Sequence, residues 1–223
     1  MKQQNTCYMC DAIATSREHV PPVCFFPEQK DIKRDLRKNL ITVPSCVTHN
    51  SEKSDDDAIL CAIVLMIADK SGVAHHLFCD KFLKAVRRKP HVYRQCFTDR
   101  GWVNDMQAGA FQIDRERFRI CMDRMTRAIF RYEYGWSWPE RILMETPKLF
   151  TGIIDGRVLV DHNRMTALAG IKILMSVLPE KGCNPEVFFY RSLFDESQQI
   201  FALEVCFYES VDVYMFSSRN PLA

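Results

Sequence analysis

Four residues with metal-binding side chains occur as two closely spaced pairs in the first quarter of the chain. Cys7 and Cys10 form C-x2-C, and Cys46 and His49 form C-x2-H. Each pair spans one tight turn, so both of its ligands can point at the same place. Three thiolates and one imidazole complete a tetrahedral site without water, which is the arrangement of a structural zinc ion. Two unrelated pairs of core residues are the alternative, and the repeated turn-like spacing favours zinc.

A carboxylate and a histidine stand next to each other between these two pairs. Glu18 directly precedes His19, and Val20 and two prolines follow. Asn39 comes later, Asn50 directly follows the last metal-ligand candidate, and Lys53 lies three residues beyond it. Taken alone, Glu18 and His19 are typical of a surface ion pair in a plain zinc-binding module. Together with Asn39 and Asn50 at their positions, the pair favours catalysis.

The order and spacing of these elements resemble the HNH endonuclease family over about the first quarter of the chain. The family pattern is C-x2-C, then Asp/Glu-His-x-x-Pro, then Asn-Leu, then C-x2-C/H followed by Asn-x-x-Lys-Ser. Here those elements are Cys7-Tyr8-Met9-Cys10, Glu18-His19-Val20-Pro21-Pro22, Asn39-Leu40 and Cys46-Val47-Thr48-His49-Asn50-Ser51-Glu52-Lys53-Ser54. The resemblance implies a zinc-stapled ββα-metal finger that hydrolyses phosphodiester bonds.

The resemblance also implies a role for each residue. His19 would be the general base that takes a proton from the attacking water, a task that suits an imidazole at neutral pH. Glu18 and Asn50 would be the protein ligands of a catalytic divalent ion, and oxygen ligands with open, water-filled positions suit Mg²⁺ or Mn²⁺. Asn39 would hold the loop of His19 by hydrogen bonds, and Lys53 would contact a phosphate.

Three positions depart from the commoner family residues. The fourth zinc ligand is His49 instead of cysteine, which zinc accepts equally well. Glu18 replaces the usual aspartate, and its longer arm changes the reach to the ion. Asn50 stands where histidine is common, which favours a hard ion over a catalytic zinc.

A basic stripe is expected on a helix from Asp114 to Tyr132, which Gly135 would end. Apolar residues recur there at spacings of three and four, and four arginines fall on the opposite face. These arginines are Arg117, Arg124, Arg127 and Arg131. A row of this kind binds phosphate backbones. A solvated face neutralised by neighbouring acids is an equally good interpretation, and an acidic partner protein is a third.

Composition bounds the class of protein. The chain has 223 residues, of which 47% are hydrophobic and 26% are charged, so long disordered stretches are not expected. The net charge of +2 gives no global attraction for nucleic acid. Seven of the ten cysteines lie outside the two pairs and are expected to be small core residues. We expect a cytoplasmic protein with no membrane segment, because the longest apolar run, from Ala58 to Ala68, is too short.

The remaining pattern predicts the α+β class. A zinc-stapled module is expected over residues 1–70, and a body of helices followed by a C-terminal antiparallel sheet over residues 71–223. The expected elements are a strand at Leu40–Val43, a buried helix at Ala58–Ala68, a helix at Phe78–Val86, a hairpin within Leu149–Val160, a mostly buried helix at Arg164–Leu178, and strands at Val187–Leu193, Ile200–Tyr208 and Val211–Phe216.

The sequence thus predicts a metal-dependent endonuclease with a structural zinc ion and a catalytic Mg²⁺ or Mn²⁺ ion. DNA is a more probable substrate than RNA, and the body is expected to position substrate, to form a homodimer or to dock a partner protein. A role in bacterial anti-phage defence is expected only by analogy with the family. Two alternatives stay open. One is a non-catalytic zinc module that binds nucleic acid or protein, and the other is an effector subunit of a larger complex.

Overall fold

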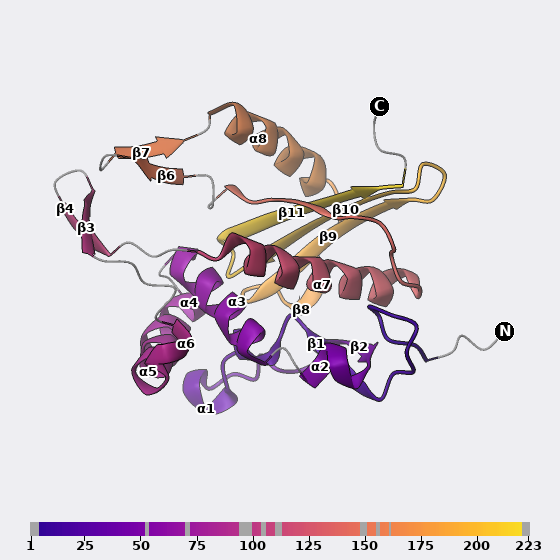
Figure 1. Ribbon diagram of the computed structural model, residues 1–223, viewed down its shortest axis with the longest axis horizontal. Coiled ribbons are helices and arrows are strands. Elements are labelled where there is room, and N and C mark those ends of the chain that lie inside the picture. The colour runs from indigo at the N-terminus through magenta and orange to yellow at the C-terminus, as the bar shows by residue number, and fades with distance from the viewer. Residues whose placement is uncertain are drawn as a thin grey trace.

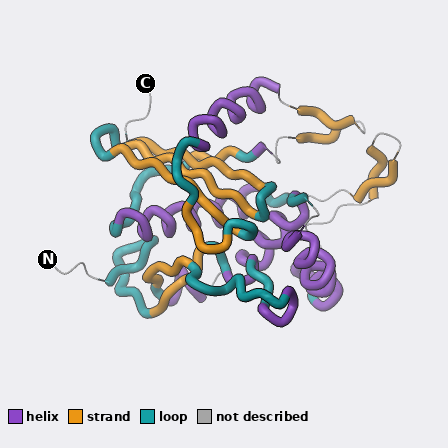
Figure 2. The backbone as a smooth tube through the Cα atoms, turned by 180° about the vertical axis from the view of Figure 1, so that it is seen from behind, coloured by secondary structure: helices purple, strands orange, loops and turns teal. Residues whose placement is uncertain are grey.

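The computed structural model describes residues 5–51, 54–69, 72–93, 100–103, 106–109, 113–147, 151–154, 157–160 and 162–219. A five-stranded antiparallel sheet lies between one long helix on its inner face and another helix on its outer face (Figures 1 and 2). A small two-stranded hairpin and a group of helices lie on the far side of the long helix. The chain is therefore of the α+β class, as the sequence predicts.

The N-terminal hairpin pairs β1 (Ser16–Val20) with β2 (Ile41–Ser45) in antiparallel register. Successive side chains of β1 alternate between buried and exposed, because a strand presents them to opposite faces. The chain continues from β2 into α2 (Val47–Ser51) and α3 (Ser54–Ile67), so the order is strand, strand, helix. The sequence predicts β2, whereas β1 is not predicted because four of its five residues are polar.

The segment between β1 and β2 connects this hairpin to the large sheet. It contains η1 (Val23–Phe25), where the ring of Phe25 packs 5.0 Å from that of Phe207 between centroids. Tyr208 donates a hydrogen bond of 2.9 Å from its hydroxyl to the carbonyl of Phe25. One hydrophobic core therefore runs from the N-terminal residues into the sheet. The domain boundary at residue 70 stays a prediction.

The C-terminal sheet has the strand order β5-β11-β10-β9-β8. Its strands are β5 (Leu143–Glu145), β8 (Lys181–Asn184), β9 (Phe188–Asp195), β10 (Ile200–Phe207) and β11 (Val211–Ser218). The three long strands form the meander that the sequence predicts, and β5 and β8 extend it at its two edges.

The long helix α7 (Arg115–Tyr134) packs against the inner face of the sheet. Asp114 caps its start by accepting a hydrogen bond from the backbone N–H of Arg117, and Gly135 ends it in the left-handed conformation with φ of 81°. Phe130 contributes to an aromatic cluster whose centroid contacts include Phe201 at 4.9 Å. The predicted helix and its end at Gly135 are confirmed.

The remaining helices surround α3, which is buried over much of its surface and packs on α7. They are α1 (Gln29–Ile32), α4 (Gly72–His76), the π-helical η2 (Leu77–Phe82), α5 (Leu83–Arg88) and α6 (Pro90–Tyr93). Within the described residues, no single helix is long and apolar enough to span a membrane. One bent pair, Val47–Ile67 with Gly72–Arg88, passes that test together and is bent by 116°.

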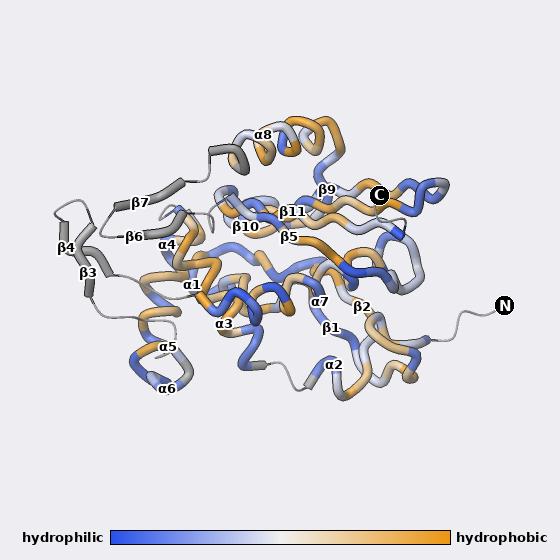
Figure 3. The backbone as a smooth tube through the Cα atoms, turned by 45° about the horizontal axis from the view of Figure 1, so that its top comes forward, coloured by the Kyte–Doolittle hydropathy of each residue, from blue (hydrophilic) through white to orange (hydrophobic). Residues whose placement is uncertain are grey.

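Helix α8 (His162–Ser176) covers part of the outer face of the sheet. Leu168 and Met175 pack against the sheet, so one side of the helix is buried. The opposite side is apolar yet exposed (Figure 3), with exposed fractions of 68% for Ile173 and 71% for Leu174. The prediction of a mostly buried helix is therefore wrong, because the described sheet contacts only one side of it.

Two small hairpins complete the described part of the chain. They are formed by β3 (Arg100–Val103) with β4 (Met106–Gly109), and by β6 (Thr151–Ile154) with β7 (Arg157–Val160). The second is the predicted hairpin, whose expected Asp-Gly turn lies outside the described residues. The prediction that the scattered cysteines lie in the core is wrong for Cys24, Cys79 and Cys183, which are exposed. Cys96 lies outside the described residues.

Candidate functional site

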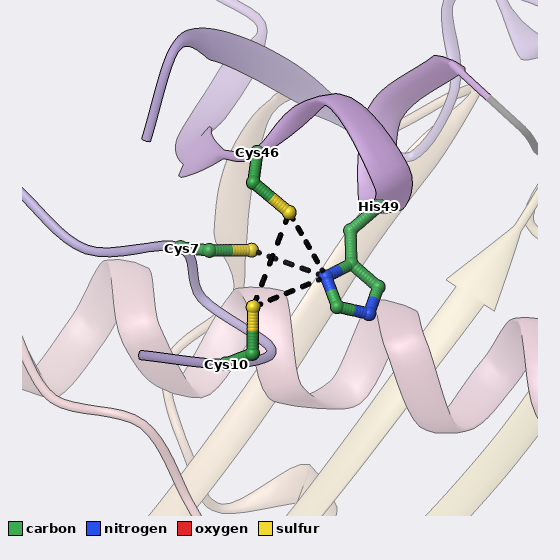
Figure 4. A group of neighbouring side chains, drawn as sticks. All are labelled: Cys7, Cys10, Cys46 and His49. Atoms are coloured by element: carbon green, nitrogen blue, oxygen red, sulfur yellow. Dashed lines mark hydrogen bonds between the residues drawn. The ribbon is translucent and has the colours of Figure 1, made fainter. Parts of the chain in front are cut away.

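The four metal-ligand candidates converge in three dimensions (Figure 4). Cys7 and Cys10 lie in the turn before β1, Cys46 links β2 to α2, and His49 lies on α2. Their sulfur and nitrogen ligand atoms all lie within 4.8 Å of one another. The hairpin register brings the two turns together, because β1 and β2 place the ends of the two half-sites side by side.

The distances between the ligand atoms fit a tetrahedral metal ion. Zinc bonds of about 2.3 Å to sulfur and about 2.0 Å to nitrogen imply separations of about 3.8 Å between sulfurs and about 3.5 Å between sulfur and nitrogen. The sulfurs of Cys10 and Cys46 are 3.9 Å apart. Nδ1 of His49 lies 3.5 Å from the sulfur of Cys7, 3.5 Å from that of Cys10 and 3.3 Å from that of Cys46. The cluster can therefore bind a structural ion such as zinc.

The electrostatics of the cluster depend on how the thiols share protons. Burial raises the pKa of Cys7, but hydrogen bonds from the backbone of Met9 and Cys46 and from His49 outweigh it and lower the pKa to about 7. A backbone hydrogen bond at Ala12 lowers the pKa of Cys10, yet burial and the neighbouring thiols leave it raised. Because the ion binds thiolates, metal binding releases protons from this cluster.

Glu18 connects the metal cluster to the hairpin. Its side chain is only 5% exposed, and its two oxygens accept hydrogen bonds from the hydroxyl of Tyr8 at 3.1 Å and from that of Ser45 at 3.4 Å. Tyr8 is itself buried, and burial first and the charge of Glu18 second raise the pKa of its hydroxyl. Tyr8 therefore keeps its proton and remains a hydrogen-bond donor to the carboxylate.

Asn50 lies in the same neighbourhood as Glu18. Its side-chain amide donates a hydrogen bond of 2.8 Å to the hydroxyl of Ser16, which in turn donates to the carbonyl of Ser45 at 3.1 Å. Ser16 and Ser45 face each other across the hairpin. The structure thus links the two expected ligands of a catalytic ion through one pair of serines.

His19 is exposed, whereas Glu18 is buried, because neighbouring residues of β1 point to opposite faces. The two residues nevertheless line one small hollow, together with Asp57 and Arg124. The sequence does not single out Asp57 as a site residue, because an acidic run such as Asp55-Asp56-Asp57 is typical of the first turn of a helix. Which of the three aspartates lies beside the hairpin depends on how α3 is rotated about its own axis.

The two other predicted site residues contribute less. Asn39 is exposed, adopts a left-handed φ of 53° two residues before β2, and lines a hollow with Val20 and Pro21. Among the described residues, no hydrogen bond joins its side chain to His19, so its positioning role stays a prediction. Lys53 lies outside the described residues.

Two arginines of the predicted basic stripe form ion pairs within the fold. Asp56 of α3 accepts hydrogen bonds from Arg117 at 2.7 Å and from Arg124 at 3.0 Å. The pairs are partly exposed and hold α7 to α3. The sequence cannot predict this, because Asp56 is more than sixty positions away from either arginine.

A third arginine of the stripe is also engaged. Arg127 pairs with Asp123 at 2.8 Å and donates to the carbonyls of Trp138 and Glu140, which fixes the segment after α7. Arg131 is half-buried, and within the described residues no carboxylate forms an ion pair with it. The stripe is therefore largely structural, and phosphate binding by these arginines stays a prediction.

Tyr8→Phe tests the support of the buried carboxylate. Removal of the hydroxyl leaves an oxygen of Glu18 without this donor, and we expect the free energy of unfolding to fall by about 1–3 kcal/mol. Urea denaturation measures the change. Tyr132→Phe is the matched control, because Tyr132 is 53% exposed and its hydroxyl is accessible to water. Equal stability of the two variants would show that the Tyr8 bond contributes nothing.

Comparisons of the chain with models of known protein families, with curated proteins and with solved structures find no match.

Proposed function

We propose that the chain is an HNH-type endonuclease that hydrolyses phosphodiester bonds in nucleic acid, with DNA as the preferred substrate. One observation carries the proposal. A hairpin and a helix meet at a Cys3His cluster, and beside it Glu18 is hydrogen-bonded to Ser45 and Asn50 to Ser16, the residue paired with Ser45 across the hairpin. His19, the residue next to Glu18, is exposed.

The donor set suits a hard divalent ion. Glu18 and Asn50 offer a carboxylate and an amide oxygen, the ligand types that Mg²⁺ and Mn²⁺ prefer. When bound, such an ion supplies charge stabilisation at the scissile phosphate and at the leaving oxygen. Asp57, which lines the same hollow as Glu18, is a third oxygen donor within this neighbourhood.

His19 has the accessibility that a general base needs. Its imidazole is exposed, so water and a phosphodiester can both reach it, whereas the buried Glu18 cannot take this role. Burial of the carboxylate and exposure of the histidine follow from the alternation of one strand. The Cys3His cluster fixes the ends of β1 and α2. This keeps the distance between the Glu18 carboxylate and the His19 imidazole constant.

A plasmid assay tests the proposal. Purified zinc-loaded protein is incubated with supercoiled plasmid in the presence of Mg²⁺, of Mn²⁺ or of neither, and the open-circular product is quantified. We expect nicking that requires the added ion. An RNA substrate in a parallel reaction measures the preference for DNA. The absence of any cleavage of either polymer with both ions would contradict the proposal.

A second candidate function is a non-catalytic zinc module. The burial of Glu18 favours it, because both carboxylate oxygens already accept hydrogen bonds from Tyr8 and Ser45. In that case the carboxylate joins the metal cluster to the hairpin, and the chain acts by binding nucleic acid or as an effector subunit of a complex. Nucleic-acid binding without cleavage would support this candidate.

A further inference from the structure

A second hollow lies at the edge of the N-terminal hairpin, beside the C-terminal end of α7. Its lining is formed by Asn5, Arg17, Thr42, Val43, Pro44, Arg131, Tyr132 and Gly135. Two arginines from distant parts of the chain therefore meet here, one from β1 and one from α7. Among the described residues, this lining contains no carboxylate, unlike the surroundings of Arg117, Arg124 and Arg127.

The two arginines are available to an anion. The guanidinium of Arg17 is exposed and donates from Nε to the hydroxyl of Thr42 and from Nη2 to its carbonyl, both at 2.8 Å. These bonds fix the orientation of the group and leave its other N–H donors unused. Within the described part of the chain, neither Arg17 nor Arg131 forms an ion pair. Phosphate oxygens accept charge-assisted hydrogen bonds from guanidinium groups, so both side chains can bind a phosphate.

The hollow is adjacent to the candidate base. Arg17 and His19 lie two residues apart on β1, so their side chains share the exposed face and their Cα atoms are separated by about 6.6 Å. Thr42, which orients Arg17, is also the register partner of His19 on β2. This separation is close to the distance between neighbouring phosphates of an extended nucleic-acid strand.

An exposed aromatic ring completes the surface. Tyr132 lines the hollow and is 53% exposed, although an aromatic side chain of a core helix is usually covered. A base stacked on such a ring contributes to the binding of single strands, whose bases are unpaired. Cationic groups interleaved with an exposed ring are the common composition of single-strand binding surfaces.

We infer that this hollow binds the strand that His19 cuts, with phosphates on Arg17 and Arg131 and an unpaired base on Tyr132. The inference rests on the proposed function for the identity of the polymer. It assigns substrate binding to Arg17, which lies outside the family-like motif. Of the four arginines of the α7 stripe, it assigns substrate binding only to Arg131.

The inference is tested by measuring nucleic-acid binding with a variant that is expected not to cut its substrate. Full-length, zinc-loaded His19→Ala protein is titrated into short fluorescein-labelled single strands of DNA and RNA and into duplex DNA, and fluorescence anisotropy is followed over a range of salt concentrations. In that background, Arg17→Gln and Arg131→Gln are each expected to weaken single-strand binding roughly tenfold. The double variant is expected to reduce the slope of log K against log salt by about 1.4, since each lost phosphate contact removes about 0.7.

Three variants control this experiment. Arg87→Gln with Arg115→Gln removes the same charge from exposed positions outside the hollow and is expected to leave the slope nearly unchanged. Thr42→Val removes the hydroxyl partner of Arg17 but keeps both charges, so it is expected to weaken binding less than Arg17→Gln. Tyr132→Leu is expected to weaken single-strand binding by about tenfold or more and duplex binding less.

The outcomes separate this inference from the proposed function. Binding that depends on Arg17 and Arg131 in a protein whose wild type never cuts would support strand binding by the hollow and contradict the proposed nuclease. Equal slopes for the hollow and control double variants would overturn the inference, even if the wild type cuts DNA. Failure of the parent protein to bind any strand, or a loss from Thr42→Val as large as that from Arg17→Gln, would overturn it as well.

Discussion

Cys46→Ser is expected to release the metal ion and to unfold the N-terminal hairpin and α2. The sulfur of Cys46 lies within 3.9 Å of that of Cys10 and 3.3 Å from Nδ1 of His49, so its loss opens a site in which protein supplies all four ligands. A serine hydroxyl does not replace a thiolate as a zinc ligand at neutral pH. Metal analysis should therefore fall from about one zinc per chain to near zero.

The effect on stability should be large. Structural zinc binds small domains with apparent free energies of about 10–16 kcal/mol at neutral pH, whereas a whole domain is stable by only about 5–15 kcal/mol. The loss should also reach the sheet, because Phe25 and Phe207 belong to a core that the hairpin segment shares. A marked decrease in the melting temperature is the expected result in calorimetry.

Cys183→Ser is the matched control, since this thiol is exposed on β8 and lies outside the cluster. It should keep both the metal and the melting temperature of the wild type. A Cys46→Ser protein that retains its zinc and melts like the Cys183→Ser protein would contradict the assignment of the cluster.

His19→Ala is expected to reduce the rate of phosphodiester cleavage by about 10²–10⁴-fold, the usual contribution of a general base. The exposed position of His19 predicts that the fold, the zinc content and the melting temperature stay unchanged, because the side chain is not part of the core. Initial rates of plasmid nicking at saturating Mn²⁺ measure the effect.

His91→Ala provides the comparison for this loss. His91 is exposed on α6 and lies outside the hollow that Glu18 and His19 line, so its replacement should leave the rate intact. Equal rates for the His19→Ala protein and the wild type would remove His19 as the base. A loss of zinc in the His19→Ala protein would mean instead that the residue supports the fold.

Features that depend on local spacing could be predicted from the sequence. The ligands in each turn are three positions apart, and the apolar face of α7 repeats every three or four residues, so each half-site and the helix follow from short stretches of chain. The capping residues Asp114 and Gly135 mark the ends of α7 in the same way.

Features that depend on packing between distant segments could not be predicted from the sequence. The shared face of four arginines is a local property, but the position of Asp56 opposite two of them is set by the contact of α3 with α7. The sequence predicts no role for Arg17, because its position beside Arg131 depends on the contact of α7 with β1 and β2. The exposure of Ile173 on α8 likewise depends on how much of the helix the sheet covers.

The proposed function requires a second, catalytic ion beside the zinc, at Glu18 and Asn50. Titration of Mn²⁺ into zinc-loaded protein, followed by the electron paramagnetic resonance signal of the free ion, measures this without reference to cleavage. Glu18→Gln keeps the size of the side chain, so its zinc content serves as the control for folding. We expect the wild type to bind one Mn²⁺ ion per chain and Glu18→Gln to lose it while keeping zinc. Wild-type protein that binds no Mn²⁺, or undiminished Mn²⁺ binding by Glu18→Gln, would contradict this second metal site.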